Sequence, residues 1–393
     1  MMTQTIQKVL TRDFILAFIA QFAFATVFHI LIPTLPIYLL RLGSTEVEIG
    51  VLIGSFAFSS LVLRPFIGRA LLKIHEKNFM IAGALLYALT SIAYLSASPF
   101  WPFLIVRILQ GIGFAFFQTA SITLIANISS GAHRGRSLSY FYLSMNLSGA
   151  LGPSLGMLLI NHFSFTLLFL ACSGLSLCSL FVTNKLGRRQ VAPLQNSSQD
   201  DGLFLSRKAL PPSIIGFFSL FIFGALSTFF PLYAINHGVA NPGLFFTTLA
   251  IMLILGRGLG GKILDLYSKE RIILPCLIAY IISMVILAFS KTLPMFILVA
   301  MIYGIGHAFL IPTLVVYTLD RVGSSTGPAM GTFSAITDLG FSLGPVMMGI
   351  IIHATSYPIM FVCLALTTII NLSYFYFFVR KKGRLLNYKS SRP

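Results

Sequence analysis

Residues 329–353 read AMGTFSAITDLGFSLGPVMMGIIIH, and Asp338 is the one acidic or basic side chain among them apart from the terminal histidine. A helix needs about 20 apolar residues to cross a bilayer, and this stretch supplies them. Asp338 would then lie about half-way across, where a carboxylate costs roughly 2.5–3.5 kcal/mol to insert. Charges kept at that depth usually line a polar path for an ion or solute. The alternative is a neutral or hydrogen-bonded Asp that holds two helices together.

The whole chain has the composition of a membrane protein. It is 56% hydrophobic and 9% charged, with a mean hydropathy of +0.90, whereas soluble domains have about 25% charged residues. The sequence predicts an all-α membrane protein with twelve transmembrane helices and no sizeable soluble domain. The predicted spans are 13–40, 46–69, 79–97, 101–127, 136–161, 164–184, 212–236, 243–264, 271–290, 293–319, 328–354 and 357–379.

The formal net charge of +17 does not require a nucleic-acid partner, because the basic residues are sorted by side. With the N-terminus in the cytoplasm, Arg41 and Lys291 are the Lys and Arg residues that fall on the outer side, and Arg64, Arg107 and Arg257 fall within spans. The others lie in cytoplasmic segments, as the positive-inside rule requires. We therefore expect both termini in the cytoplasm, in a bacterial inner (cytoplasmic) membrane.

A polar segment divides the chain in two. Residues 185–211 contain the run QNSSQDDG and two adjacent prolines, which is typical of a linker. We expect an N-terminal six-helix bundle (1–184), a cytoplasmic linker (185–211), a C-terminal six-helix bundle (212–379) and a basic cytoplasmic tail (380–393). The four cysteines fall inside spans, which favours apolar packing over disulfides or a metal site.

The two halves repeat. Several sequence landmarks of the first half recur in the second half, and the distance along the chain from each landmark to its copy is the same to within one residue. This regularity predicts two pseudo-symmetric bundles with a substrate site near the membrane midplane. The repeated landmarks are Arg64 and Gly68 with Arg257 and Gly261, Gly111-Ile112-Gly113 with Gly304-Ile305-Gly306, Leu151-Gly152-Pro153 with Leu343-Gly344-Pro345, and Asn146 with Asp338.

Four motifs carry a family resemblance. The first helix ends IPTLPIY (32–38), the segment after the second reads RPFIGRALLK (64–73), the fourth contains RILQGIG (107–113), and the fifth contains GALGPSLG (149–156). Over nearly its whole length the chain resembles a major facilitator superfamily transporter, and most of all the twelve-helix drug:proton antiporter branch, which works in efflux.

The resemblance implies roles for several of these residues. It ties Arg107 to proton transfer, with carbonyl capping as the alternative, and it links Gly152-Pro153 to export, with close helix packing as the alternative. It also implies a cytoplasmic latch between halves, in which Asp265 would meet the start of the fifth helix; the alternative is that these charges only mark the cytoplasmic surface. The gating set is then Asp265, Arg257, Arg64, Gly68, Gly261, Gly152, Pro153, Gly344 and Pro345.

Further polar side chains lie within spans. Arg107, Gln110 and Gln118 recur at helical spacing and share one face. His29 and His307 lie near mid-depth and are candidates for a proton relay, or else are buried and hydrogen-bonded. The candidate set for proton coupling and substrate binding is Asp338, Arg107, His29, His307, Gln110, Gln118, Asn146, Tyr303 and Gln21.

These observations predict a proton-coupled secondary transporter that exports small molecules by alternating access, without a cofactor and as a monomer. An importer of a small nutrient such as a carboxylate, amino acid or sugar is the alternative. A receptor or scaffold with a transporter fold is a third class. An enzyme is not expected, because the sequence lacks HExxH and a midplane acidic pair. GRGLGG (256–261) closes an apolar helix and follows no strand, so it is not a dinucleotide site.

Overall fold

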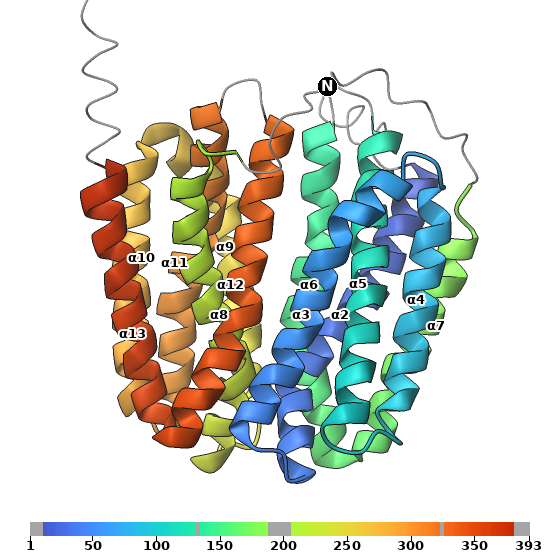
Figure 1. Cartoon of the computed structure of the whole chain (residues 1–393), viewed down its shortest axis with the longest axis horizontal. Coiled ribbons are helices and arrows are strands. Elements are labelled where there is room, and N and C mark those ends of the chain that lie inside the picture. Colours follow the sequence, from blue (N-terminus) through green and yellow to red (C-terminus); the bar gives the residue numbers. More distant parts are fainter. Residues whose placement is uncertain (1–10, 130–133, 188–205, 323–325, 381–393) are drawn as a thin grey trace, which may run out of the picture. The chain divides into compact units, whose positions relative to one another are not determined.

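A computed structural model describes residues 11–129, 134–187, 206–322 and 326–380 (Figure 1). The regular elements of these ranges are helices, and they confirm the predicted class of all-α membrane protein with twelve long helices. The helices are α2 (Arg12–Arg41), α3 (Glu46–Ala70), α4 (Glu76–Ala93), α5 (Trp101–Ile128), α6 (Arg134–His162), α7 (Phe165–Asn184), α8 (Leu210–Asn236), α9 (Gly243–Leu266), α10 (Lys269–Phe289), α11 (Leu293–Val322), α12 (Thr326–Ala354) and α13 (Tyr357–Tyr374), with a π-helical extension η2 (Phe375–Arg380).

Most of these helices are long and apolar enough to span a bilayer. Ten meet that condition in the described ranges, which makes the protein a multi-pass integral membrane protein. The two others are α4, which opens with Glu76 and Lys77, and α9, whose described apolar part is Gly243–Gly256. The side chains of residues 257–265 of α9 lie outside the description.

Local sequence signals set several helix starts. At the start of α3, the backbone N–H of Thr45 donates to the Glu48 carboxylate at 2.8 Å, and the N–H of Glu48 donates to the Thr45 hydroxyl at 3.3 Å. This reciprocal pair is a capping box. Thr11 caps α2 and Ser164 caps α7 in the simpler way, each accepting from a backbone N–H three residues on.

The chain forms two compact units. Unit 1 comprises Met1–Ser44, Ser55–Asp200 and Ala240–Gly243, and unit 2 comprises Thr45–Gly54, Asp201–Val239 and Leu244–Pro393. In unit 1 the main helix pairs are α2 with α6, α4 with α5 and α4 with α7. In unit 2 they are α8 with α12, α10 with α11 and α10 with α13, which is the same set one repeat later (Figure 1).

The repeated Gly-Ile-Gly motif explains one of these pairings. A Cβ placed on Gly113 of α5 would lie 3.1 Å from the carbonyl oxygen of Gly83 on α4. A Cβ placed on Gly306 of α11 would lie 3.1 Å from the carbonyl oxygen of Cys276 on α10. Both glycines therefore allow two backbones to approach closely at equivalent points of the repeat.

The repeated Gly-Pro motif has the same effect on another pair. A Cβ on Gly152 of α6 would lie 2.7 Å from the Cβ of His29 on α2. A Cβ on Gly344 of α12 would clash with the carbonyl oxygen of Phe221 on α8. The prolines that follow, Pro153 and Pro345, are buried inside continuous helices. The motif thus packs α6 on α2 and α12 on α8.

Candidate functional site

The polar side chains of α5 face the interior of unit 1. Arg107, Gln110, Gly111, Phe114 and Gln118 are all buried, and Arg107 is only 5% exposed. A polar stripe on a membrane helix is expected to avoid lipid, and α5 follows that rule.

Arg107 takes part in a small hydrogen-bond network between α5 and the end of α4. Its guanidinium donates to the Gln110 side-chain oxygen at 2.7 Å and to the Tyr94 hydroxyl at 3.4 Å. The Tyr94 hydroxyl donates to the same Gln110 oxygen at 2.6 Å. The guanidinium also lies over the Phe56 ring, 4.6 Å from its centroid. The network fixes a permanent positive charge inside the apolar part of unit 1.

A second cluster joins α2, α5 and α6 around Gln21, which is fully buried. The Gln21 amide donates to the Gln118 side-chain oxygen at 2.8 Å and approaches the Met145 sulfur at 3.1 Å. The Ser121 hydroxyl donates to the Gln21 oxygen at 3.0 Å. Gln21 and Gln118, both predicted as site residues, are thus brought together. Asn146 follows Met145 on α6 and is partly buried.

His29 of α2 contacts α6 about one turn after Met145. Its Nδ1 is 2.9 Å from the carbonyl oxygen of Ala25 and 3.1 Å from the Ser148 hydroxyl. A Cβ on Gly149 would lie 3.3 Å from its Nε2. His29 is partly buried, its Nδ1 is hydrogen-bonded, and its Nε2 edge faces Gly149 of α6.

In unit 2, His307 belongs to an aromatic cluster contributed by three helices. The Tyr280 hydroxyl lies 2.5 Å from His307 Nδ1. The Tyr303 ring stacks on the imidazole with centroids 5.7 Å apart, and the Phe223 ring stacks at 5.1 Å. Tyr303, predicted to share the face of His307, does so. Phe341 of α12 extends the cluster, 6.0 Å from Phe223.

Asp338 lies on α12, one turn before Phe341, and is partly buried. Its backbone oxygen accepts from the Ser342 hydroxyl at 3.0 Å. Its neighbour Thr337 is 4% exposed and packs against Gly216 of α8. Asp338 thus borders the face of α12 that packs on α8. Asp338 belongs to unit 2 and Arg107 to unit 1, so the structure describes each within its own unit.

The predicted gating residues differ in how deeply they are buried, and the side chains of some are not described. Arg64 is partly buried on α3, whereas Gly68 is exposed, and a Cβ there would meet nothing within 4 Å. Gly152, Pro153, Gly344 and Pro345 are packed as described above. In unit 2 the first turns of α3 also contact α12, because a Cβ on Gly54 would lie 2.5 Å from the carbonyl oxygen of Ser342. Of the second-half latch, Arg257, Gly261 and Asp265 fall in the part of α9 whose side chains are not described.

Sequence reasoning missed Tyr94 and Tyr280, which hold Arg107 and His307. The repeat could have pointed to Tyr280, because Tyr280 occupies in unit 2 the position that Tyr87 occupies in unit 1. Both tyrosines are fully buried. They differ in their hydroxyls: that of Tyr280 bonds His307, whereas that of Tyr87 has no hydrogen-bond partner in the described residues.

This contrast gives a paired prediction. Tyr280→Phe removes the hydroxyl that bonds Nδ1 of the partly buried His307, so we expect a loss of about 0.5–1.5 kcal/mol in the free energy of unfolding. Tyr87→Phe removes a hydroxyl that is already unpaired, so we expect no loss and a gain of up to about 1 kcal/mol. Thermal unfolding of the two variants in one detergent measures both. Equal losses in the two variants would contradict the assignment.

The comparison with known families agrees with this geometry. The model of the Major Facilitator Superfamily matches residues 17–271 and 240–392. The chain belongs to the Major Facilitator Superfamily. As a member it is a transporter-type membrane protein of the kind that carries small molecules.

Several curated relatives are named as export or drug-resistance proteins. The chain is 25% identical over 350 residues to a staphylopine export protein of Staphylococcus aureus, covering 84% of this chain and 86% of the relative. It is 24% identical over 349 residues to multidrug resistance protein 2 of Bacillus subtilis, covering 84% and 87%. It is 23% identical over 342 residues to the quinolone resistance protein NorA of S. aureus, covering 81% and 84%.

Solved structures share the fold. The nucleoside transporter NupG superposes with a TM-score of 0.77 at 15% identity, covering 93% of this chain and 98% of NupG. A POT family transporter in complex with a thioalcohol-conjugated peptide superposes with a TM-score of 0.79 at 13% identity, covering 94% and 96%.

Proposed function

We propose that the protein is a proton-coupled antiporter of the superfamily that exports small molecules by alternating access. The observation that carries the coupling is Asp338, a carboxylate half-way along an apolar helix and only partly buried. A carboxylate at that depth is unfavourable unless it serves an ion or solute path. Its reversible protonation biases which of two conformations is populated.

The direction of transport rests on the relatives. One relative is named as an export protein, and two others are named as drug-resistance proteins, a role that export of the drug would explain. None of the described features favours import. We therefore propose efflux of a solute against its gradient, driven by protons that enter the cell.

A quinolone is the probe, because one relative is a quinolone resistance protein. In unit 2, Asp338 offers an exchangeable negative charge that suits the amine of such a solute. The Phe223 and His307 rings of the same unit stack at 5.1 Å and are both partly exposed, and aromatic rings suit planar groups. In unit 1, Arg107 is a permanent cation held by Tyr94 and Gln110.

The remaining features of the proposal follow from the sequence. The distribution of Lys and Arg supports cytoplasmic termini in a bacterial inner membrane. We further propose that the protein works as a monomer and without a cofactor. His29 in unit 1 and His307 in unit 2 are proposed to assist proton movement, since imidazole exchanges protons near neutrality.

Proteoliposomes test the proposal directly. Purified protein is reconstituted, a gradient of one pH unit is imposed, and a fluorescent quinolone is added outside. If one proton exchanges for one solute, the quinolone concentrates in the acidic compartment by up to about tenfold. Movement in the same direction as the protons would indicate an importer, and pH-independent fluorescence in every arm would indicate that the protein does not transport this class.

A further inference from the structure

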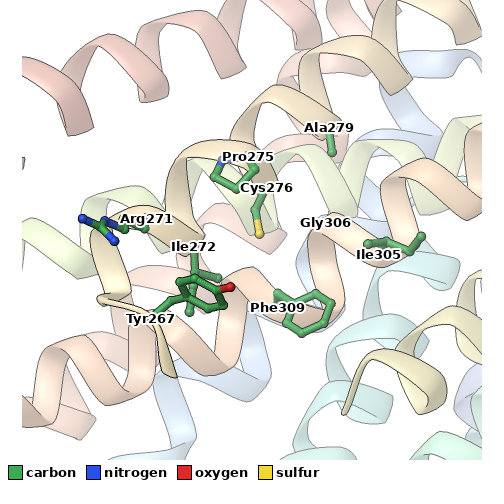
Figure 2. A pocket seen from close by; sticks show the side chains of 9 residues that line it. All are labelled: Tyr267, Arg271, Ile272, Pro275, Cys276, Ala279, Ile305, Gly306 and Phe309. Atoms are coloured by element: carbon green, nitrogen blue, oxygen red, sulfur yellow. The ribbon is translucent and has the colours of Figure 1, made fainter. Parts of the chain in front are cut away.

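A groove outside the clusters described above runs between α10 and α11. Its volume is about 360 Å³, within the range of small-molecule sites. Arg271, Pro275 and Ala279 line it from α10 at intervals of one helical turn, and Ile305 and Phe309 line it from α11. Figure 2 shows Arg271 at one end of this group and Ala279 and Ile305 at the other.

Small residues create this space. Gly306 faces Cys276 and Ala279, and a Cβ on Gly306 would lie 3.3 Å from the Cβ of Ala279. At the equivalent point of unit 1, Gly113 faces Leu86 instead, at the same 3.3 Å. Ala279 carries only a methyl group where Leu86 carries a larger, branched side chain, which is consistent with more space at this position of unit 2. The position equivalent to Arg271 in the first repeat is Asn78, so the cation is also particular to unit 2.

The polar end of the groove carries an available positive charge. Lys269, two residues before Arg271, is paired with Asp320 at 3.5 Å. Arg271 has no recorded ion pair within the described ranges and is exposed. Tyr267, which is 53% exposed, also lines the groove, and its hydroxyl points toward Phe309 in Figure 2. The rest of the lining is apolar, apart from the Cys276 thiol.

The dimensions of the groove match one membrane leaflet. From Arg271 to Ala279 the helix rises roughly 12 Å, at about 1.5 Å per residue. Half of the hydrocarbon core of a bilayer is roughly 15 Å thick. Since α10 begins at Lys269, Arg271 lies at the membrane surface and the apolar end points toward the midplane. An occupant therefore has an anionic head at the surface and an extended apolar chain.

We propose that this groove is a binding site for an anionic phospholipid, with its phosphate against Arg271 and one acyl chain along Pro275, Ala279, Ile305 and Phe309. The proposal does not depend on the direction of transport or on Asp338. It requires only that α10 and α11 border lipid, which the exposed Ile278, Ile282 and Ile305 indicate.

The single tryptophan of the chain makes the test practical. Trp101 is replaced by Phe, and Phe309→Trp places a new reporter in the groove; Ile305→Trp, at an exposed position, is the second reporter if the first does not fold. The protein is reconstituted in phosphatidylcholine vesicles that contain increasing fractions of either brominated phosphatidylglycerol or brominated phosphatidylcholine. Quenching of tryptophan fluorescence by the bromines reports contact with each lipid.

We expect brominated phosphatidylglycerol to reach half-maximal quenching at a mole fraction about fivefold lower than brominated phosphatidylcholine, the preference that one cation near anionic lipid provides. Arg271→Gln removes this preference. Lys208→Gln, an exposed cation outside the groove, keeps it. Ala279→Phe fills the groove and also removes it. Equal quenching by the two lipids, or an unchanged preference in Arg271→Gln, would overturn the proposal.

Discussion

Asp338→Asn is expected to abolish the accumulation of solute in proteoliposomes under an imposed gradient of one pH unit. Wild-type protein concentrates a quinolone probe up to about tenfold when one proton exchanges for one solute. The amide keeps the shape of the side chain and cannot exchange a proton, so the solute is no longer coupled to the gradient. The accumulation ratio then falls to that of protein-free liposomes.

The same variant is expected to remain folded. Replacing a carboxylate by an amide inside an apolar helix removes a charge that is unfavourable at that depth. The backbone bond from Ser342 to residue 338 is unaffected by the change. The thermal unfolding midpoint of Asp338→Asn should therefore equal or exceed that of the wild type, which separates a coupling defect from a folding defect.

Asp320→Asn is the matched control. Asp320 lies on α11 and is 55% exposed, where it pairs with Lys269 at 3.5 Å. Exposed ion pairs contribute about 0–1 kcal/mol, so this variant should keep both its fold and its accumulation ratio. A wild-type accumulation ratio in Asp338→Asn, or an equal loss in both variants, would remove Asp338 from the coupling mechanism.

The helices could be predicted from the sequence because hydropathy reports them directly. Each long apolar stretch must satisfy its backbone hydrogen bonds internally in a bilayer, and a helix does so. The sequence repeat also has a structural reason at one pair of positions, because Gly113 and Gly306 each allow two helices to approach closely. Gly68 belongs to the same repeated set and yet faces open space, so repetition alone does not reveal which glycines pack.

The partners of the polar residues were harder to predict. Gln110 lies one turn from Arg107 on the same helix, so their contact follows from helical spacing. Tyr94 comes from the end of another helix, and nothing in its local sequence distinguishes it from other tyrosines near a membrane surface. Contacts such as Tyr280 with His307 depend on the angle between two helices, which side-chain packing sets.

Arg107→Lys is expected to lower the transport rate by roughly 10- to 150-fold, although the charge is kept. Arg107 donates to Gln110 and Tyr94 and lies over the Phe56 ring. A lysine is a compact charge that cannot reproduce this planar arrangement. Hydrogen bonds to charged groups contribute about 1.5–3 kcal/mol, which sets that range if their loss displaces the charge from its working position. Initial rates in proteoliposomes measure the effect.

Arg41→Lys supplies the comparison that separates geometry from charge. The Arg41 guanidinium also lies over a phenylalanine ring, 5.2 Å from the centroid of Phe165, but it is exposed at the end of α2. Substitutions at exposed positions usually change stability by less than about 0.5 kcal/mol, so transport by Arg41→Lys should stay close to the wild-type rate. If Arg107→Lys also transported at that rate, a positive charge near Gln110 would be sufficient, and the hydrogen-bond network with Tyr94 would have no part in transport.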